Sequence, residues 1–244
     1  MTKFEVLYLS LEPFFPPLQQ EVRARLRSFA RASQTPPDIL DVGGRLSNYT
    51  IGLAANITVT DIERRSAIQE KLHLGTNDGM MARLAKRRSN LTAIRYDDMT
   101  RSDLPSRSYD CVVAVEVLEH VEEDEIFVAQ VRRVLRPGKA FLMTTPNGEF
   151  VKNVNPDHKR HYTREQLKNL LEKHFDTVEV VYAVKTGYLY GLSLRSWDWK
   201  HPIRTAITMA AGALSAMQSR SPRVKFESTS THQLVACAKT KAED

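Results

Sequence analysis

The sequence predicts an α/β fold in which a mostly parallel sheet carries helices on both faces. Seven short apolar runs are spread along the chain, and helical patterns lie between most of them. Strands that alternate with helices pair in parallel through right-handed crossovers. The apolar runs are continuous and do not alternate with polar residues, as is typical of strands buried on both faces.

The composition is that of a globular protein. The chain of 244 residues, 42% of them hydrophobic, can bury one large core, so we expect a single domain over residues 1–244. No apolar run reaches the roughly 18 residues that span a bilayer, and we expect no signal peptide. Cys111 and Cys237 lie in apolar runs, which favours a reducing compartment and a cytoplasmic protein. The net charge of +6 permits an anionic substrate or a membrane surface without requiring either.

The N-terminal segment, residues 1–37, is expected to be helical and to precede the first strand. Basic residues line one side of a helical pattern over residues 17–32. The apolar residues on its other side are Leu18, Val22, Leu26 and Phe29. We expect this stripe to pack against the core or to act as a lid.

Strands and helices then alternate to the end of the chain. The expected strands are residues 38–42, 57–62, 91–97, 109–117, 139–146, 178–184 and 232–239. The charged residues 63–90 are expected to be helical. A helix over residues 126–135 ends at Arg-Pro-Gly, which is a stop signal. A further helix over residues 163–175 begins with Thr163 and Gln166 at the spacing of a capping box.

A long connection, residues 185–231, separates the last two expected strands. It contains an expected helix over residues 202–220 whose apolar face is formed by Ile203, Ile207, Ala210, Leu214 and Met217. We interpret the connection as a lid-like insertion over the substrate site. A second interpretation is a basic, aromatic platform that makes peripheral contact with a membrane and docks an anionic or lipid-linked acceptor there. A nucleic-acid role is not favoured, because no recognised nucleic-acid motif accompanies these residues.

Acidic residues end four of the expected strands. Asp41 and Asp61 close the first two, Asp98 the third and Glu116 the fourth. In doubly wound sheets, ligands bind beyond the carboxyl ends of the strands. A carboxylate accepts two hydrogen bonds, so an acid at the end of the second strand suits the two hydroxyls of a ribose. A rim of carboxylates disfavours a pyrophosphate but tolerates a sulfonium and an ammonium group, which argues against a dinucleotide.

The motifs resemble those of the class I S-adenosylmethionine-dependent methyltransferases. They are DVGG from Asp41, TDI from Thr60, DDM from Asp97, EVLEHV from Glu116, LRPG from Leu135 and TTPN from Thr144. Their order and relative placement match the family from about residue 38 to residue 184. EVLEHV and TTPN are closest to the small-molecule O-methyltransferases of the ubiquinone-biosynthesis type.

This resemblance implies both a fold and a cofactor. The fold is a Rossmann-like, seven-stranded sheet of order 3-2-1-4-5-7-6 with strand 7 antiparallel, and the cofactor is S-adenosyl-L-methionine. The expected cofactor-binding residues are Asp41, Gly43, Gly44, Asp61, Ile62, Asp98, Met99 and Glu116. Asp61 would take the ribose, Asp98 and Met99 would flank the adenine, and Glu116 would line the sulfonium side.

The glycine loop departs from the family pattern. The family reads acid-x-Gly-x-Gly-x-Gly, whereas here Gly43 matches the first glycine and Arg45 and Ser47 stand at the second and third. Gly44 is an additional glycine. The roles of Arg45 and Ser47 stay open.

Three histidines are candidates for catalysis, because a weakly acidic hydroxyl acceptor needs a base. His120, which follows the fourth strand on the cofactor side, is the first choice. His158 and His161 lie in the loop after the fifth strand and would supply or orient a base. Together with Asn147 and Tyr162, these two histidines are expected to line the acceptor site.

The sequence therefore predicts an enzyme that methylates an oxygen of a small molecule, a glycan or a lipid-linked intermediate. Methylation of carbon or nitrogen stays open, since such acceptors can react without a base. A non-catalytic relative that serves as a scaffold is a further alternative, supported by the altered glycine loop. No metal is expected, although Glu116, Glu119 and His120 lie within five residues and permit a divalent ion.

Overall fold

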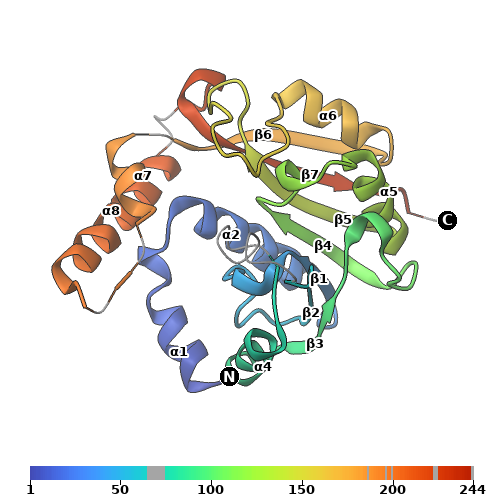
Figure 1. The fold of residues 1–244 in the computed structure, drawn as a ribbon, viewed down its shortest axis with the longest axis horizontal. Helices are drawn as coiled ribbons and strands as arrows, with labels where there is room; N and C mark the ends of the chain where they lie inside the picture. The colour runs from blue at the N-terminus through green and yellow to red at the C-terminus, as the bar shows by residue number, and fades with distance from the viewer. Residues whose placement is uncertain (65–74, 186, 196, 199, 222–224, 243–244) are drawn as a thin grey trace.

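The computed structural model describes residues 1–64, 75–185, 187–195, 197–198, 200–221 and 225–242. Its centre is a seven-stranded sheet of order β3-β2-β1-β4-β5-β7-β6 (Figure 1). The strands are β1 (Asp38–Val42), β2 (Asn56–Asp61), β3 (Leu91–Tyr96), β4 (Tyr109–Val115), β5 (Leu135–Pro146), β6 (Thr177–Lys185) and β7 (Thr231–Lys239). Neighbouring strands from β3 to β5 are parallel, whereas β7 is antiparallel to β5 and β6. The strand order and the direction of β7 confirm the predicted fold.

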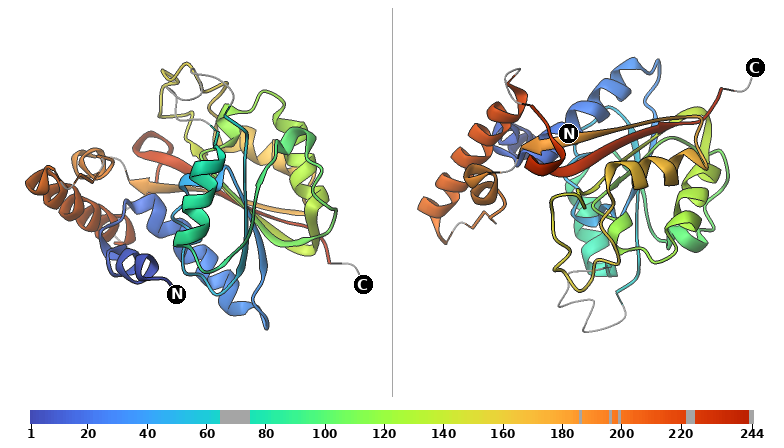
Figure 2. Two further views of the ribbon diagram at one scale, coloured as in Figure 1. Left: turned by 60° about the horizontal axis from the view of Figure 1, so that its bottom comes forward. Right: turned by 90° about the horizontal axis from the view of Figure 1, so that it is seen from above.

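Helices cover both faces of this sheet. They are α1 (Lys3–Ser10), α2 (Pro17–Ala32), α4 (Asp78–Arg87), α5 (Asp124–Val134), α6 (Arg164–Glu172), α7 (Tyr188–Ser193) and α8 (Pro202–Arg220). Short 3₁₀ helices are η1 (Glu12–Phe14), η2 (Gly44–Leu46), η3 (Met99–Arg101), η4 (Leu118–His120) and η5 (Ser228–Ser230). Helices α7 and α8 lie at the end of the molecule opposite to the C-terminus (Figures 1 and 2).

Two hydrophobic cores flank the sheet, because successive residues of a strand point to opposite faces. In β4, Val112 packs in the core with α5 and α6, whereas Val113 packs in the core with α2. The apolar stripe expected near the N-terminus is buried in the second core through Leu18, Val22 and Leu26. Helix α2 therefore belongs to the core of the domain.

The start of β5 differs from the expected boundary. Helix α5 ends at Val134, as the stop signal predicts, but the chain enters β5 at once through Leu135. The Arg136 guanidinium then donates to the carboxylates of Asp110 (2.7 Å) and Asp38 (2.9 Å). It thereby joins the amino ends of β1, β4 and β5, at the edge of the sheet opposite to the acids described above.

Two further predicted helices are present, one over residues 163–175 and one within residues 63–90. The capping box of Thr163 and Gln166 is present at the start of α6. The charged residues 63–90 contain α4, which begins after the N-cap residue Asn77, while residues 65–74 lie outside the described residues. No helix in the described ranges is long and apolar enough to cross a membrane.

Helix α8 has the predicted bounds but presents its large apolar side chains to solvent. Ile203 is 77% exposed and Leu214 is 50% exposed. The residues that face the rest of the protein are small: Thr205, Thr208, Ala211, Gly212, Ser215 and Ala216. A Cβ atom at Gly212 would lie 2.4 Å from the carbonyl oxygen of Phe14, so the close approach of α8 to η1 depends on this glycine.

We expect Gly212→Ala to lower the free energy of unfolding by about 1–3 kcal/mol, because a backbone carbonyl has to move to admit the methyl group. The matched control is Gly191→Ala in α7, where no atom of the described residues lies within 4 Å of an added Cβ atom. The control should be neutral or stabilising, since alanine favours a helix by about 1 kcal/mol. Thermal unfolding followed by circular dichroism measures both. Equal melting temperatures of the two variants would contradict the close approach.

Candidate functional site

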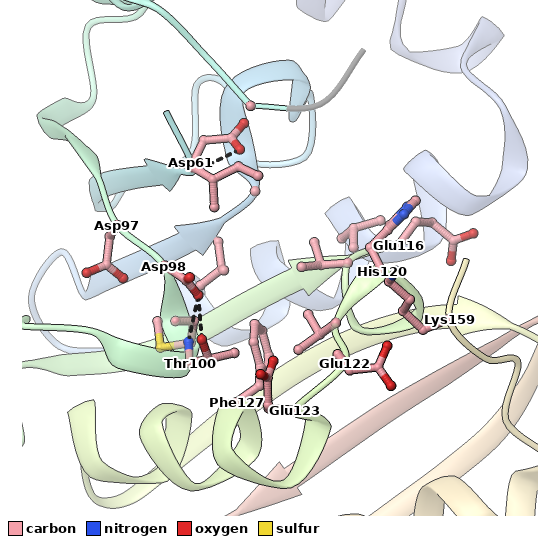
Figure 3. A pocket seen from close by; sticks show the side chains of 18 of the residues that line it. Asp61, Asp97, Asp98, Thr100, Glu116, His120, Glu122, Glu123, Phe127 and Lys159 are labelled. Carbon is pink, nitrogen blue, oxygen red and sulfur yellow. Dashed lines mark hydrogen bonds between the residues drawn. The ribbon is translucent and has the colours of Figure 1, made fainter. Parts of the chain in front are cut away.

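Two cavities meet at the carboxyl ends of the strands, and Glu116 lies in the wall between them. The first cavity, of about 550 Å³, is formed by the ends of β1, β2, β3 and β4 with η3 and η4. The second cavity, also of about 550 Å³, lies between β4, β7, α7 and the N-terminal residues. Figure 3 shows the first cavity, with Asp61, Asp97 and Asp98 on one side and Glu116 and His120 on the other.

The glycine loop closes one end of the first cavity. Gly43 adopts φ +69°, and a Cβ atom there would lie 2.8 Å from Val117. A Cβ atom at Gly44 would lie 2.6 Å from Cγ of Asp41. Each glycine therefore has a different steric reason: Gly43 permits the left-handed turn, and Gly44 makes room for the carboxylate beneath the loop.

Asp41 supports this loop from below and does not line the cavity. Its side chain is buried, and its Oδ2 accepts a hydrogen bond from the Thr50 hydroxyl (2.7 Å). The Thr50 oxygen in turn accepts one from Arg88 (2.5 Å). Burial raises the pKa of Asp41, and the positive charge of Arg88 opposes that rise. Of the predicted cofactor residues, Asp41 and Gly44 lie behind the lining.

Asp61 faces the first cavity from the end of β2. Its Oδ1 accepts from the backbone N–H of Ile62 (2.8 Å), and its Oδ2 forms an ion pair with Nε of Arg45 (3.1 Å). Burial raises the pKa of Asp61 to about 6. Arg45, which stands at the second glycine of the family pattern, thus forms an ion pair with the acid that was predicted to hold a ribose.

Two neighbouring acids follow β3 and behave differently. Both oxygens of Asp98 are engaged within η3: Oδ1 accepts from Thr100, and Oδ2 pairs with Nε of Arg101 (2.9 Å). Oδ2 of Asp97 is buried and has no hydrogen-bond partner within the described ranges. Asp97 also lines the first cavity, and sequence reasoning missed it although it precedes Asp98 in the same motif.

Glu116 follows β4 in a left-handed conformation with φ 54°, which is uncommon for a residue other than glycine. Its Oε1 accepts a hydrogen bond from the Thr144 hydroxyl (2.9 Å). Glu119 lies deeper, where its Oε2 accepts from Thr145 (3.2 Å). Burial raises the pKa of both glutamates, and the neighbouring carboxylate adds to the rise at Glu119.

The three predicted histidines form one chain of contacts. Nδ1 of His120 lies 3.0 Å from Oδ2 of Asp157, and its ring meets that of His158 edge to face. Nδ1 of His158 lies 2.7 Å from Nε2 of His161, whose Nδ1 lies 2.8 Å from the Val151 carbonyl oxygen. Burial and the other two histidines lower the pKa of His158 to about 4. His120 alone of the three lines the first cavity.

A cluster of possible metal ligands also involves these residues. Donor atoms of Glu119, His120 and His158 lie within 4.8 Å of one another. Oε1 of Glu119 is buried and has no hydrogen-bond partner among the described residues, which suits a ligand atom, but Nδ1 of His120 already contacts Asp157. The geometry therefore permits a divalent ion at these three residues. The set considered from the sequence contained Glu116 in the place of His158.

Neither cavity is lined by the residues predicted to contact an acceptor. The Asn147 amide donates to the carbonyl oxygens of Ser228 (2.7 Å) and Thr231 (2.9 Å), and the Tyr162 hydroxyl donates to Asp124 (2.7 Å). These contacts, with those of His158 and His161, hold the loop after β5 against its neighbours.

The second cavity carries polar atoms without partners. The hydroxyl of Tyr8, Nδ1 of His232 and Oε1 of Gln233 are buried, line the cavity and form no hydrogen bond within the described part of the chain. The aromatic rings of Tyr49 and Tyr190 complete much of the wall. Sequence reasoning missed this cavity, since its residues come from segments that no local motif connects.

Comparison with known proteins finds methyltransferases among the proteins that resemble this chain. Residues 40–143 match the family model of a methyltransferase domain. A probable S-adenosylmethionine-dependent methyltransferase of Mycolicibacterium smegmatis is 34% identical over 113 residues, which cover 44% of this chain and 42% of that protein. The mitochondrial ubiquinone biosynthesis O-methyltransferase of Mus musculus is 27% identical over 157 residues, 51% of this chain and 42% of that protein. Each match spans less than half of the relative's length.

Solved structures share the fold. The phosphoethanolamine N-methyltransferase 2 of Haemonchus contortus, in complex with phosphomonomethylethanolamine and S-adenosylhomocysteine, superposes with a TM-score of 0.62 and 16% identity. The superposition covers 94% of this chain and 54% of that one. A SAM-dependent methyltransferase of Archaeoglobus fulgidus superposes with a TM-score of 0.57 and 17% identity, covering 91% and 94%.

We predict that Asp61 makes the binding of S-adenosylhomocysteine depend on pH. Only the ionised carboxylate can accept both ribose hydroxyls, so affinity should be constant above about pH 7 and fall as the pH drops through 6, the raised pKa of Asp61. Asp61→Asn should weaken binding about tenfold or more at pH 7.5. Isothermal titration calorimetry from pH 5 to pH 8 measures both effects. If Asp61→Asn kept the pH dependence of the native chain, another titratable group would cause that dependence.

Proposed function

Since residues 40–143 match the model of a methyltransferase domain, we propose that the chain is a class I S-adenosylmethionine-dependent methyltransferase that methylates a hydroxyl group of a small molecule, a sugar or a lipid-linked intermediate. The observation that carries this proposal is the meeting of the two cavities at Glu116. One cavity would hold the cofactor and the other the acceptor, so that the two reacting groups approach each other at a shared wall. Alignment of this kind can supply several kcal/mol of the barrier reduction.

The first cavity fits the cofactor in size and chemistry. Its volume of about 550 Å³ is within the range of small-molecule sites. The carboxylates of Asp61 and Asp97 offer acceptors for hydroxyl and amine hydrogens, and Ile62 and Met99 give apolar surface for a flat ring. S-adenosylmethionine, when bound, supplies an electrophilic methyl group on its sulfonium. Glu116 would lie at the sulfonium end, where a carboxylate stabilises positive charge.

The second cavity suits a neutral, hydroxylated acceptor. The buried polar atoms of Tyr8, His232 and Gln233 can donate to or accept from hydroxyl groups. Burial also lowers the pKa of His232, which keeps its ring neutral. The tyrosines of the wall give flat apolar surface for a ring or an acyl chain. An amine acceptor is the second candidate, because the carboxylate of Glu116 would attract its positive charge.

We propose His120, which lines the first cavity, as the base that takes the proton of an acceptor hydroxyl presented where the two cavities meet. Asp157 contacts Nδ1 and would hold its hydrogen there, which leaves Nε2 as the proton acceptor. His158 is poorly suited to that role, because its lowered pKa makes it a weak base. In this proposal His158 and His161 hold His120 and the loop after β5, and Asn147 and Tyr162 fix the same loop.

The altered glycine loop is the support for a non-catalytic scaffold. Its two glycines belong to a formed loop at the end of the first cavity, since Gly43 makes the turn and Gly44 makes room for Asp41. We therefore favour cofactor binding. Calorimetric titration with S-adenosylhomocysteine tests the choice, and absence of binding at millimolar ligand would leave only the scaffold.

We expect His120→Ala to lower turnover about 100-fold while leaving affinity for S-adenosylhomocysteine nearly unchanged, because the loss concerns proton transfer alone. Turnover is followed as transfer of a labelled methyl group to a panel of phenols, sugars and lipid-linked alcohols. Asp157→Asn should give a smaller loss. If His120→Ala abolished cofactor binding, His120 would be a binding residue, and undiminished transfer to an amine would favour N-methylation.

Glu116→Gln should lower affinity for S-adenosylmethionine about tenfold relative to S-adenosylhomocysteine, which lacks the sulfonium charge. Burial raises the pKa of Glu116, so the carboxylate forms only at a higher pH than is usual for glutamate. In the native chain the preference for the charged ligand should therefore grow as the pH rises, and in the variant it should not change. Paired titrations of both ligands measure it; a constant ratio in both proteins would place the sulfonium elsewhere.

A further inference from the structure

We infer that α8 docks the protein on an anionic membrane surface. The docking face consists of the apolar stripe Ile203, Ile207, Ala210, Leu214 and Met217. These residues recur at alternating spacings of four and three, so they follow one side of the helix from its first turn almost to its last. The basic residues around α8 supply the charge that selects an anionic surface.

Helix α8 buries small and polar residues and exposes large apolar ones, which is the reverse of an ordinary surface helix. A helix packed on a globular domain normally buries its large apolar residues and exposes polar ones. Here Thr208 and Ser215 are buried, whereas Ile203, Leu214 and Met217 are 77%, 50% and 68% exposed. A contiguous apolar surface of this kind marks an interaction site.

The shape of the docking face suits a flat, continuous partner. Helix α8 has 19 residues and is therefore roughly 28 Å long. In both Figure 1 and Figure 2 it lies at the outer edge of the molecule with α7 beside it, and its inner side contacts α2, η1 and β6. A helix that binds in the plane of a membrane buries one apolar side along its whole length.

The charge around α8 is concentrated to an unusual degree. Residues 188–225 contain six Lys or Arg residues and one acid, Asp198, which gives a formal charge of +5 out of +6 for the whole chain. Of the described residues, Arg195, Lys200, Arg220 and Lys225 are exposed. Basic residues beside an amphipathic helix attract anionic lipid headgroups.

The charge and the apolar stripe together argue against two other partners, a second copy of the chain and a nucleic acid. Two copies of the chain that paired through α8 would bring two segments of charge +5 together, which is unfavourable. A nucleic acid would use the basic residues and would leave the stripe from Ile203 to Met217 in water. An anionic membrane uses both features.

Docking would place the second cavity beside the membrane. Ser193, Leu194, Arg195 and Trp197 line that cavity and belong to the end of α7 and the segment that leads into α8. A lipid-linked alcohol could then enter the second cavity from the bilayer. This consequence rests on the proposed function, whereas the docking itself does not.

Vesicle co-sedimentation tests the docking with the full chain. We expect binding to vesicles of phosphatidylcholine mixed with phosphatidylglycerol, little binding to phosphatidylcholine alone, and weakening by salt. Ile207→Asp and Leu214→Asp should each lower the affinity about tenfold, because a charge replaces an inserted apolar side chain. The matched control is Ile126→Asp on α5, since Ile126 is 49% exposed, as Leu214 is at 50%. The control should bind like the native chain.

Several results would overturn the inference. They are absence of binding to the anionic vesicles, equal binding to both kinds of vesicle, equal loss in Ile126→Asp, or a dimer in light scattering that Leu214→Asp dissociates. Thermal unfolding of each variant checks that the fold is kept. Titration with S-adenosylhomocysteine separates the two proposals: a chain that binds this ligand but no vesicle overturns the docking alone, and one that binds vesicles but not the ligand overturns the proposed function alone.

Discussion

The burial of the Asp41 carboxylate is the constraint on which the candidate site depends. A buried carboxylate has to be hydrogen-bonded or paired, and here Thr50 and Arg88 meet that need from two other segments. The carboxylate also occupies the space that a side chain at position 44 would take. The unusual pair of glycines follows from this arrangement, because one glycine turns the chain and the next lies over the acid. The loop is thereby fixed at the end of β1, where the first cavity begins.

The topology of the sheet brings the acidic residues that end the strands close together. The chain extends from β1 through β2 to β3 in one direction and from β4 to β5 in the other. Parallel strands bring their carboxyl ends to one edge, so Asp61, Asp97 and Glu116 meet around the point where the direction reverses. The Arg136 contacts with Asp38 and Asp110 stabilise the opposite edge. The ion pairs of Arg136 and the candidate site are thus separated by the length of the strands.

Much of the fold could be predicted from sequence, since strand patterns and motif order report local structure and family. The bounds of α2 and α8 agree with the helical spacing of their apolar residues. The outward direction of the stripe on α8 could not be predicted, because periodicity defines a face but not the side on which the protein lies. The position of Gly212 inside the buried face is the one local signal of close packing.

The candidate site was predictable where a strand end defines it. Asp61, Asp98 and Glu116 line the first cavity, whereas Asp41 lies behind it; the oxygens of Asp98 are already engaged within its own 3₁₀ helix. Strand-end position alone does not tell which way a carboxylate points or which hydrogen bonds satisfy it. The second cavity depends on Tyr8, Tyr190 and Gln233 meeting in space, and no spacing along the chain reports that. The histidine assignments and the lid-like role of residues 185–231 stay predictions.

The ion pair between Arg45 and Asp61 has a kinetic consequence. If Asp61 holds the ribose, the free protein carries an internal competitor for the same carboxylate. Ligand entry then has to replace an existing contact, and Arg45 can return to Asp61 as the spent nucleoside leaves. Such competition weakens the hold on cofactor and product alike, which shortens the residence time of the product. The substitution in the glycine loop would then trade tight retention for faster release between successive turnovers.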